Sequence, residues 1–251
     1  MLEFFSQLSW VIVGQIILID ILLGGDNAIV IALACRHLPA ELRMKGIVYG
    51  TAGAIIMRIV LIAFAVSLLT LPYLKLVGGL LLIWIGTKLL VEEDDEHDGI
   101  DGGDRLSTAI KTVIVADLAM SIDNVIAVAS AAEQANADHK MMLVVFGIMI
   151  SIPMVIWGSS MILKIMDRVP ALITAGAALL GYLGGSMIQS DPALASWFIS
   201  QLPVDLLHFA NLGVRLSLAG MAGAMLVVAG GWWLSQKPGP EEEKPSAGHE
   251  A

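Results

Sequence analysis

The stretch ILIDILLGGDNAIVIALA, residues 17–34, decides the fold, because its pattern returns 97 residues later as VIVADLAMSIDNVIAVAS, residues 113–130. Each copy carries an Asp, five further residues and then an Asp-Asn pair, all inside a long apolar run. The polar residues of the two copies are Asp20, Asp26, Asn27, Asp117, Asp123 and Asn124. A carboxylate at the centre of a bilayer costs roughly 2.5–3.5 kcal/mol. Four carboxylates in matching apolar positions therefore indicate a bound ion.

The composition predicts an all-α polytopic membrane protein. Of the 251 residues, 57% are hydrophobic and 15% are charged, and the mean hydropathy is +0.81. A helix needs about 20 apolar residues to cross a bilayer, which predicts seven transmembrane helices. The apolar stretches are 9–34, 44–70, 72–91, 107–134, 140–164, 169–188 and 213–235.

The similarity between the two halves extends beyond the motifs. Gly50 matches Gly147 at the same offset of 97, and Pro72 corresponds within one residue to Pro170. A unit of three helices ends on the side of the membrane opposite its start, so the second unit enters upside down. The sequence therefore predicts two inverted three-helix repeats plus a C-terminal helix. In secondary transporters with this layout, the ion site lies near the bilayer midplane between the repeats.

The chain divides into six predicted segments. They are a first repeat (1–91), an acidic cytoplasmic loop (92–106), a second, inverted repeat (107–188), an extracytoplasmic connection (189–212), a seventh helix (213–235) and a disordered cytoplasmic tail (236–251). Lys and Arg collect on cytoplasmic segments, and an outside N-terminus gives ten of them inside against three outside. We therefore expect the N-terminus outside and the C-terminus in the cytoplasm.

Helix geometry limits how each motif can work. The rise of an intact helix separates Asp20 from Asp26 by roughly 9 Å, too far for one ion held at about 2.0–2.6 Å. Either the helix breaks at Gly24-Gly25, since paired small residues favour kinks, or the two aspartates serve different tasks. Our interpretation is a central ion site made by the two Asp-Asn pairs. The first aspartate of each motif completes it or relays protons.

The ligand chemistry favours a hard divalent cation. Carboxylate and amide oxygens suit Mg²⁺, Ca²⁺ or Mn²⁺ rather than Zn²⁺ or Cu⁺. The single cysteine, Cys35, excludes an intramolecular disulfide and a multi-cysteine metal site. The net charge of −9 and the absence of a basic stripe argue against nucleic-acid binding. We expect no resident cofactor and no catalytic residue, and the sequence leaves the oligomeric state undetermined.

The paired motifs DILLGGDN (20–27) and DLAMSIDN (117–124) resemble those of the TerC family of integral membrane proteins and its bacterial YjbE-type branch. This resemblance implies a multi-pass protein of the bacterial cell (inner) membrane that exports manganese in metal homeostasis. It carries the family's acidic ligands over to Asp20, Asp26, Asp117 and Asp123, and the amides to Asn27 and Asn124. Mn²⁺ is then the expected transported ion, with Ca²⁺ and Mg²⁺ as the alternatives.

Two further features leave alternatives open. Arg58 lies inside an apolar helix and either pairs with a motif aspartate when the cation is absent or snorkels to one surface. Gly181, Gly184 and Gly185 are typical of close helix packing, although a thin wall beside the ion path would also use them.

Three functions compete. The leading one is export of a divalent cation by alternating access, with the possibility of proton coupling. The second is an intramembrane aspartyl protease, because GGD is similar to the Gly-rich context of such catalytic acids. A shared-proton dyad explains neither the two Asn residues nor four symmetric acids. The third is a metal-responsive membrane scaffold without net transport.

Overall fold

The computed structural model describes residues 10–64, 71–91, 102–132, 140–201, 208–209, 214–215 and 217–235. Apart from one short ladder and the connecting turns, these residues are helical, which bears out the predicted all-α class. The helices are α2 (Trp10–Cys35), α3 (Ala40–Ala63), α5 (Leu74–Val91), α6 (Gly102–Ala132), α7 (Lys140–Met166), α8 (Ala171–Gln189), α9 (Ala195–Gln201) and α10 (Leu218–Ser235).

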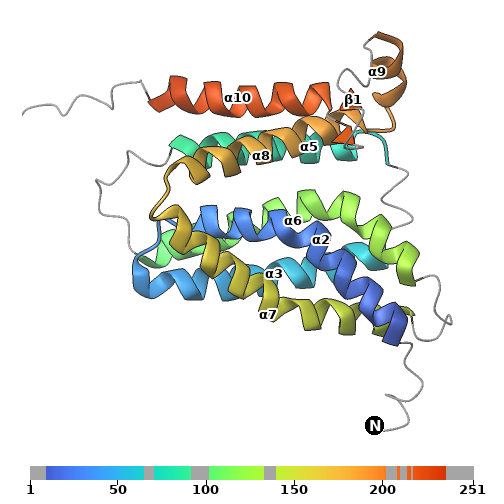
Figure 1. Cartoon of the computed structure of the whole chain (residues 1–251), viewed down its shortest axis with the longest axis horizontal. Helices are drawn as coiled ribbons and strands as arrows, with labels where there is room; N and C mark the ends of the chain where they lie inside the picture. Colours follow the sequence, from blue (N-terminus) through green and yellow to red (C-terminus); the bar gives the residue numbers. More distant parts are fainter. Residues whose placement is uncertain are drawn as a thin grey trace, which may run out of the picture.

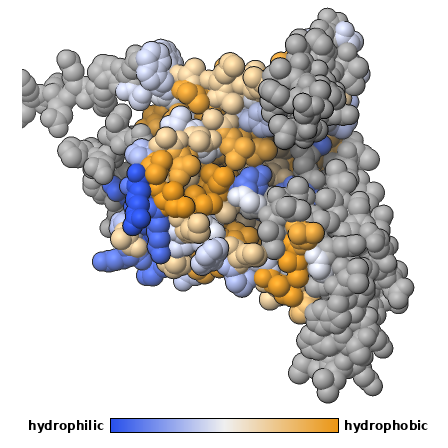
Figure 2. Space-filling model, viewed as in Figure 1, coloured by the Kyte–Doolittle hydropathy of each residue, from blue (hydrophilic) through white to orange (hydrophobic). Residues whose placement is uncertain are grey.

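The surface of the helices suits lipid. Within the described part of the chain, α3, α5, α7, α8 and α10 are long and apolar enough to cross a membrane. Large apolar side chains point outward, and Trp157, Trp232 and Trp233 are each at least 60% exposed. Figure 2 shows apolar side chains across the centre of one face and strongly hydrophilic ones at its left edge. An exposed apolar surface of this extent marks a polytopic membrane protein.

The long helices form two groups (Figure 1). In the first, α2 packs against α7 and α6, and α3 packs against α6. In the second, α8 packs against both α5 and α10. Leu33, Ile47 and Val113 are buried in the first group and Leu82 and Leu180 in the second. The motif helices α2 and α6 therefore lie together in the first group.

Glycines allow α8 to approach its neighbours closely. A Cβ at Gly185 would collide with the carbonyl oxygen of Ala219 in α10, and one at Gly184 would collide with that of Gly79 in α5. Backbone cannot move aside as a flexible side chain can, so only glycine fits these positions. The predicted close packing of the glycine cluster in α8 is confirmed.

The last long helix begins later than predicted. Val214–Arg215 (β2) pairs antiparallel with His208–Phe209 (β1), so the prediction of a helix from residue 213 was wrong. The hydroxyl oxygen of Ser217 accepts the N–H of Gly220 at 3.0 Å. This is an N-cap, which satisfies a donor that the first helical turn leaves without a partner. Ser217 therefore fixes the start of α10 at Leu218.

The acidic loop is shorter than predicted. Because α6 begins at Gly102, residues 102–106 are helical rather than part of the loop. Asp104 lies in the first turn of α6, where a negative charge interacts favourably with the helix dipole. Residues 92–101 of the predicted loop, and the predicted tail 236–251, lie outside the described residues.

The buried carboxylate of Asp191 fixes the start of α5. It accepts the N–H of Ala193 at 2.8 Å and those of Tyr73 and Leu76 at 3.1 Å each. Burial alone would raise the pKa of Asp191, but the backbone N–H donors outweigh it and hold the pKa below its usual value. Tyr73 has a left-handed backbone, with φ 66°. A residue at the end of α8 thus caps α5, which precedes it by more than 100 residues.

Candidate functional site

Both motif helices are continuous. α2 is helical through Gly24-Gly25, and α6 is helical through the equivalent Ser121-Ile122. The alternative of a helix break at Gly24-Gly25 is therefore wrong, although α2 changes direction along its length (Figure 1). Inside a bilayer, unwinding would expose backbone groups that lipid cannot hydrogen-bond, so a bend that keeps the ladder costs less. The other alternative, in which the two aspartates of a motif serve different tasks, stays a prediction.

A buried ion pair lies at the second motif. The Nη2 of Arg58 in α3 donates to Oδ1 of Asp117 in α6 at 2.5 Å. Its Nε donates to Oγ of Ser121 at 3.1 Å, and that hydroxyl donates to Oδ2 of Asp117 at 3.1 Å. Both charged residues are only 6% exposed. Arg58 therefore pairs with a motif aspartate, and the snorkelling alternative is wrong.

Sequence features of α3 and α6 bring this pair together. A Cβ at Gly50 would press against Val113, and one at Gly53 against Ile114, so these glycines let α3 lie close to α6. Asp117 and Ser121 are four residues apart and share one face of α6. The closed triangle of guanidinium, carboxylate and hydroxyl satisfies the charges where water is excluded.

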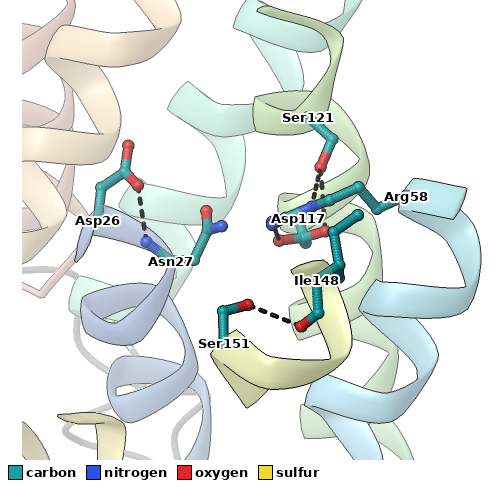
Figure 3. A network of polar contacts seen from close by, with 7 residues as sticks. All are labelled: Asp26, Asn27, Arg58, Asp117, Ser121, Ile148 and Ser151. Atoms are coloured by element: carbon teal, nitrogen blue, oxygen red, sulfur yellow. Dashed lines mark hydrogen bonds and ion pairs between the residues drawn. The ribbon is translucent and has the colours of Figure 1, made fainter. Parts of the chain in front are cut away.

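The two side chains of the first motif's Asp-Asn pair point to different sides of α2 (Figure 3). Asn27 is 4% exposed, and Figure 3 shows its amide pointing from α2 toward the Arg58–Asp117 pair. The half-buried carboxylate of Asp26 lies on the other side, where its Oδ1 accepts the N–H of Asn27 at 2.9 Å. Oδ1 of Asn27 has no hydrogen-bond partner within the described part of the chain. A buried acceptor in that state is costly and is available to a cation.

The sequence analysis missed the contribution of α7. Ser151 is 2% exposed, and its hydroxyl donates to the carbonyl oxygen of Ile148 at 2.8 Å on the face that meets the site (Figure 3). Pro153 lies inside α7 and has no N–H to give the carbonyl of Met149 four residues earlier. A serine and a proline within the apolar run of α7 are the signals that could have identified this helix as part of the site.

Three further predicted site residues lie on the motif helices. Asp20 lies in α2 and Asp123 in α6, but their side chains are outside the described residues. Asn124 is half-buried in α6. Among the side chains that are described, no three His, Cys, Asp or Glu groups come together. The six-residue metal site therefore stays a prediction, of which the structure brings Asn27 and Asp117 toward a common region.

Comparison with known proteins gives the family. Residues 5–237 match the family described as "Integral membrane protein TerC family". The chain belongs to the TerC family. The chain is 47% identical over 191 residues to the membrane protein YjbE of Bacillus subtilis, covering 76% of this chain and 83% of YjbE. The resemblance read from the two motifs is thereby confirmed.

The chain is also similar, at lower identity, to two further bacterial membrane proteins. YceF of Bacillus subtilis is 28% identical over 194 residues, covering 74% of this chain and 73% of YceF. The UPF0053 inner membrane protein YgdQ of Escherichia coli K12 is 27% identical over 221 residues, covering 80% of this chain and 87% of YgdQ. No solved structure matches this TerC-family chain.

Proposed function

We propose that this TerC-family protein is a transporter that exports a hard divalent cation through a site between its two motifs. The observation that carries the proposal is the buried Arg58–Asp117–Ser121 cluster facing Asn27. An intramembrane ion pair is costly and marks a functional site by default. Its charges are already balanced without a cation, so the pair describes a resting state from which a cation can displace the guanidinium.

The described oxygens suit a hard ion. Asp117 offers a carboxylate and Ser121 a hydroxyl. Asn27 offers an amide oxygen that accepts no hydrogen bond from the described residues. Oxygen ligands of this kind prefer Mg²⁺, Ca²⁺ and Mn²⁺ over softer ions. Membership of the TerC family adds manganese as the expected cargo, and Asp20, Asp26, Asp123 and Asn124 would complete the ligand set.

Arg58 acts in this proposal as an internal stand-in for the cation. When a divalent ion approaches Asp117, the guanidinium loses its 2.5 Å contact and must move aside. Because one positive charge leaves as two arrive, the site gains a unit of charge. Release of a proton from a further motif carboxylate, Asp20 for instance, would balance that gain, and this is our proposed basis for proton coupling.

Helix packing supports two inverted repeats. If α2, α3 and α5 of the first repeat correspond in order to α6, α7 and α8 of the second, the α2–α7 contact is equivalent to the α6–α3 contact. Both contacts are extensive. In the second group, the Gly79–Gly184 approach corresponds, by a shift of 98 residues, to the Gly86–Ala177 approach. Together with seven helices of 18 or more residues within the described chain, this favours rocking of one repeat against the other.

The same proposal covers location and class. We infer a multi-pass protein of the bacterial cell (inner) membrane with the N-terminus outside. Arg36 lies in the turn after α2, Arg43 near the start of α3 and Arg168 in the turn after α7, and basic residues at helix ends stay in the cytoplasm. We also infer that the protein is not an enzyme. An aspartyl dyad needs two carboxylates sharing a proton, whereas Asp117 is held by a guanidinium.

Flux into sealed vesicles tests the proposal. Proteoliposomes sorted for inside-out orientation would receive external Mn²⁺, with Ca²⁺ and Mg²⁺ as competitors and a lumenal pH dye as the proton readout. We compare the wild type with Asp26→Asn plus Asp123→Asn. Saturable uptake that the double variant reduces at least tenfold is the expected result.

A matched control removes two carboxylates elsewhere. Glu41→Gln plus Asp104→Asn changes two exposed acids by the same charge and should leave flux within about twofold. If folded wild-type protein moves none of the three ions, the transport proposal fails, and a metal-responsive scaffold becomes the better reading.

A further inference from the structure

A second polar feature lies where α2 ends and α6 begins. A cavity of about 660 Å³ opens where the turn between α2 and α3 meets the end of α5 and the start of α6. Its basic lining residues are Arg36, His37, Arg43, Lys88 and Arg105. No Asp or Glu of the described residues lines it. We call these residues and their cavity the basic pocket.

The basic pocket is built on fixed groups. The guanidinium of Arg36 is buried and donates to the carbonyl oxygen of Leu89 at 2.9 Å. Arg43 donates to the carbonyl oxygens of Leu38 and Arg36 at 3.0 Å each, and to Asp167 at 2.9 Å on the exposed side. These bonds hold two positive charges in place before any ligand arrives, which reduces the entropy cost of binding.

Neutral donors complete the wall. Nε2 of His37 accepts the Nε–H of Arg36 at 2.7 Å, so a neutral imidazole carries its proton on Nδ1 and can donate it. Burial, together with the neighbouring arginines, lowers the pKa of His37 to about 4, so the ring is neutral near pH 7. Thr108 and Thr112 in α6 add hydroxyl groups, and Ala40 adds the N-terminus of α3. Helix N-termini favour anions.

The basic pocket is unsuited to the cation path. Four permanent positive charges, of which that of Arg43 is paired with Asp167, disfavour a divalent cation, and the described lining offers no carboxylate ligand. Its volume lies within the range of roughly 300–1,000 Å³ typical of small-molecule sites, and is larger than one simple anion requires. Eight acidic residues between positions 92 and 104 adjoin it in sequence and weaken anion binding in general, so saturable binding requires the directed donors described above.

One neighbour indicates where the basic pocket lies relative to lipid. The ammonium of Lys88 is 5.8 Å from the ring centroid of Trp84, which is 58% exposed on the outside of α5. Exposed tryptophans next to basic residues collect at the membrane–water interface. A headgroup could then enter the basic pocket while its acyl chains lie along α5.

We propose that the basic pocket binds a phosphoryl anion, with the headgroup of an anionic phospholipid as the favoured source over a soluble phosphate. This site is separate from the motif cluster and does not depend on the transport proposal. Arg105 and Thr108, one turn apart on α6, would contact the phosphoryl oxygens against the fixed charges of Arg36 and Arg43. Basic pockets between membrane helices recognise such headgroups.

Equilibrium binding to the purified full chain in detergent tests this site. The probes are dioctanoyl phosphatidylglycerol, dioctanoyl phosphatidylcholine and inorganic pyrophosphate, followed by native mass spectrometry and by the unfolding midpoint. We expect saturable binding of phosphatidylglycerol and at least tenfold weaker binding of phosphatidylcholine. Tighter binding of pyrophosphate than of either lipid would keep the phosphoryl site and assign it to a soluble ligand.

Variants on one helix provide the control. Arg105→Gln should weaken phosphatidylglycerol binding roughly tenfold, since charge-assisted hydrogen bonds are the strong ones, and Thr108→Val should weaken it severalfold without a change of charge. Lys111→Gln removes the same charge from an exposed position of α6 outside the basic pocket and should change binding less than twofold. Equal effects of Arg105→Gln and Lys111→Gln, or equal binding of both lipids, would overturn the proposal.

Discussion

Replacing Arg58 by Gln tests the buried pair directly. In the wild type, the guanidinium neutralises Asp117, and each residue is 6% exposed. Removing one partner of a buried ion pair leaves an uncompensated charge and costs roughly 3–5 kcal/mol. Since 1 kcal/mol corresponds to about 2–4 °C for a chain of this size, the unfolding midpoint of Arg58→Gln should fall by roughly 6–12 °C at the lower end of that range.

The double variant Arg58→Gln plus Asp117→Asn separates charge from packing. It removes both charges, while amide groups can still hydrogen-bond to Ser121. We therefore expect it to be more stable than Arg58→Gln alone, with a coupling energy of about 2–3 kcal/mol between the two positions.

A divalent cation should rescue the single variant. If Mn²⁺ occupies the place of the guanidinium beside Asp117, it will stabilise Arg58→Gln more than the wild type. At a concentration 100 times the dissociation constant the gain would be about 2.7 kcal/mol. The assay is tryptophan-fluorescence thermal unfolding of the full chain in detergent, with and without MnCl₂.

Arg168→Gln is the matched control, because Arg168 is exposed in the turn after α7. It should shift the midpoint by no more than about 1–2 °C, as surface substitutions usually do. The reasoning is refuted if Arg58→Gln is no less stable than this control. It is also refuted if the loss of stability in the double variant equals the sum of the losses in Arg58→Gln alone and Asp117→Asn alone.

Three further predictions concern other parts of the molecule. Asp191→Ala should lower the free energy of unfolding by roughly 2 kcal/mol, because it uncaps α5. The folded-state pKa of Asp191 is lowered, so this advantage of the wild type is present above pH about 4 and is lost as the pH falls through the folded-state pKa. Chemical unfolding of both proteins across this pH range measures the difference. Gly185→Ala should destabilise the protein by roughly 1–3 kcal/mol by pushing α8 from α10, whereas Gly103→Ala, where a Cβ meets nothing within 4 Å, should be neutral or slightly stabilising in the same thermal assay. The NMR titration of His37, assigned with His37→Gln, should have its midpoint near pH 4 instead of about 6.5. The stability that depends on the neutral imidazole is then lost as the pH falls from about 6.5 toward 4. A midpoint above pH 6 would contradict the burial of His37.

Helix positions were predictable where the need for long apolar segments in lipid dominates. The boundaries of α2, α5, α7 and α8 lie within a few residues of the apolar stretches, because lipid demands long apolar helices with satisfied backbones. The errors occur outside that environment. The start of α10 depends on strand pairing and a serine cap, and the start of α6 on a helix that extends beyond its apolar part.

The candidate site was only partly predictable. The motifs identified Asn27 and Asp117 as polar groups that need a partner at membrane depth. For Arg58 the sequence left two alternatives, an ion pair with a motif aspartate or a side chain that snorkels to one surface. The sequence could not decide which carboxylate Arg58 would meet, because that depends on how closely Gly50 and Gly53 let α3 approach α6.

By itself, the sequence determined the class of protein, the family and the list of polar residues that lipid cannot solvate. Those follow from local composition and from a pattern repeated at a fixed offset, both of which are properties of the linear chain. Only the tertiary structure decided that α2 stays helical at Gly24-Gly25, that Asp117 pairs with Arg58, and that five basic residues gather around one pocket. Each of these depends on the distance between side chains far apart in the sequence, and packing of whole helices sets that distance.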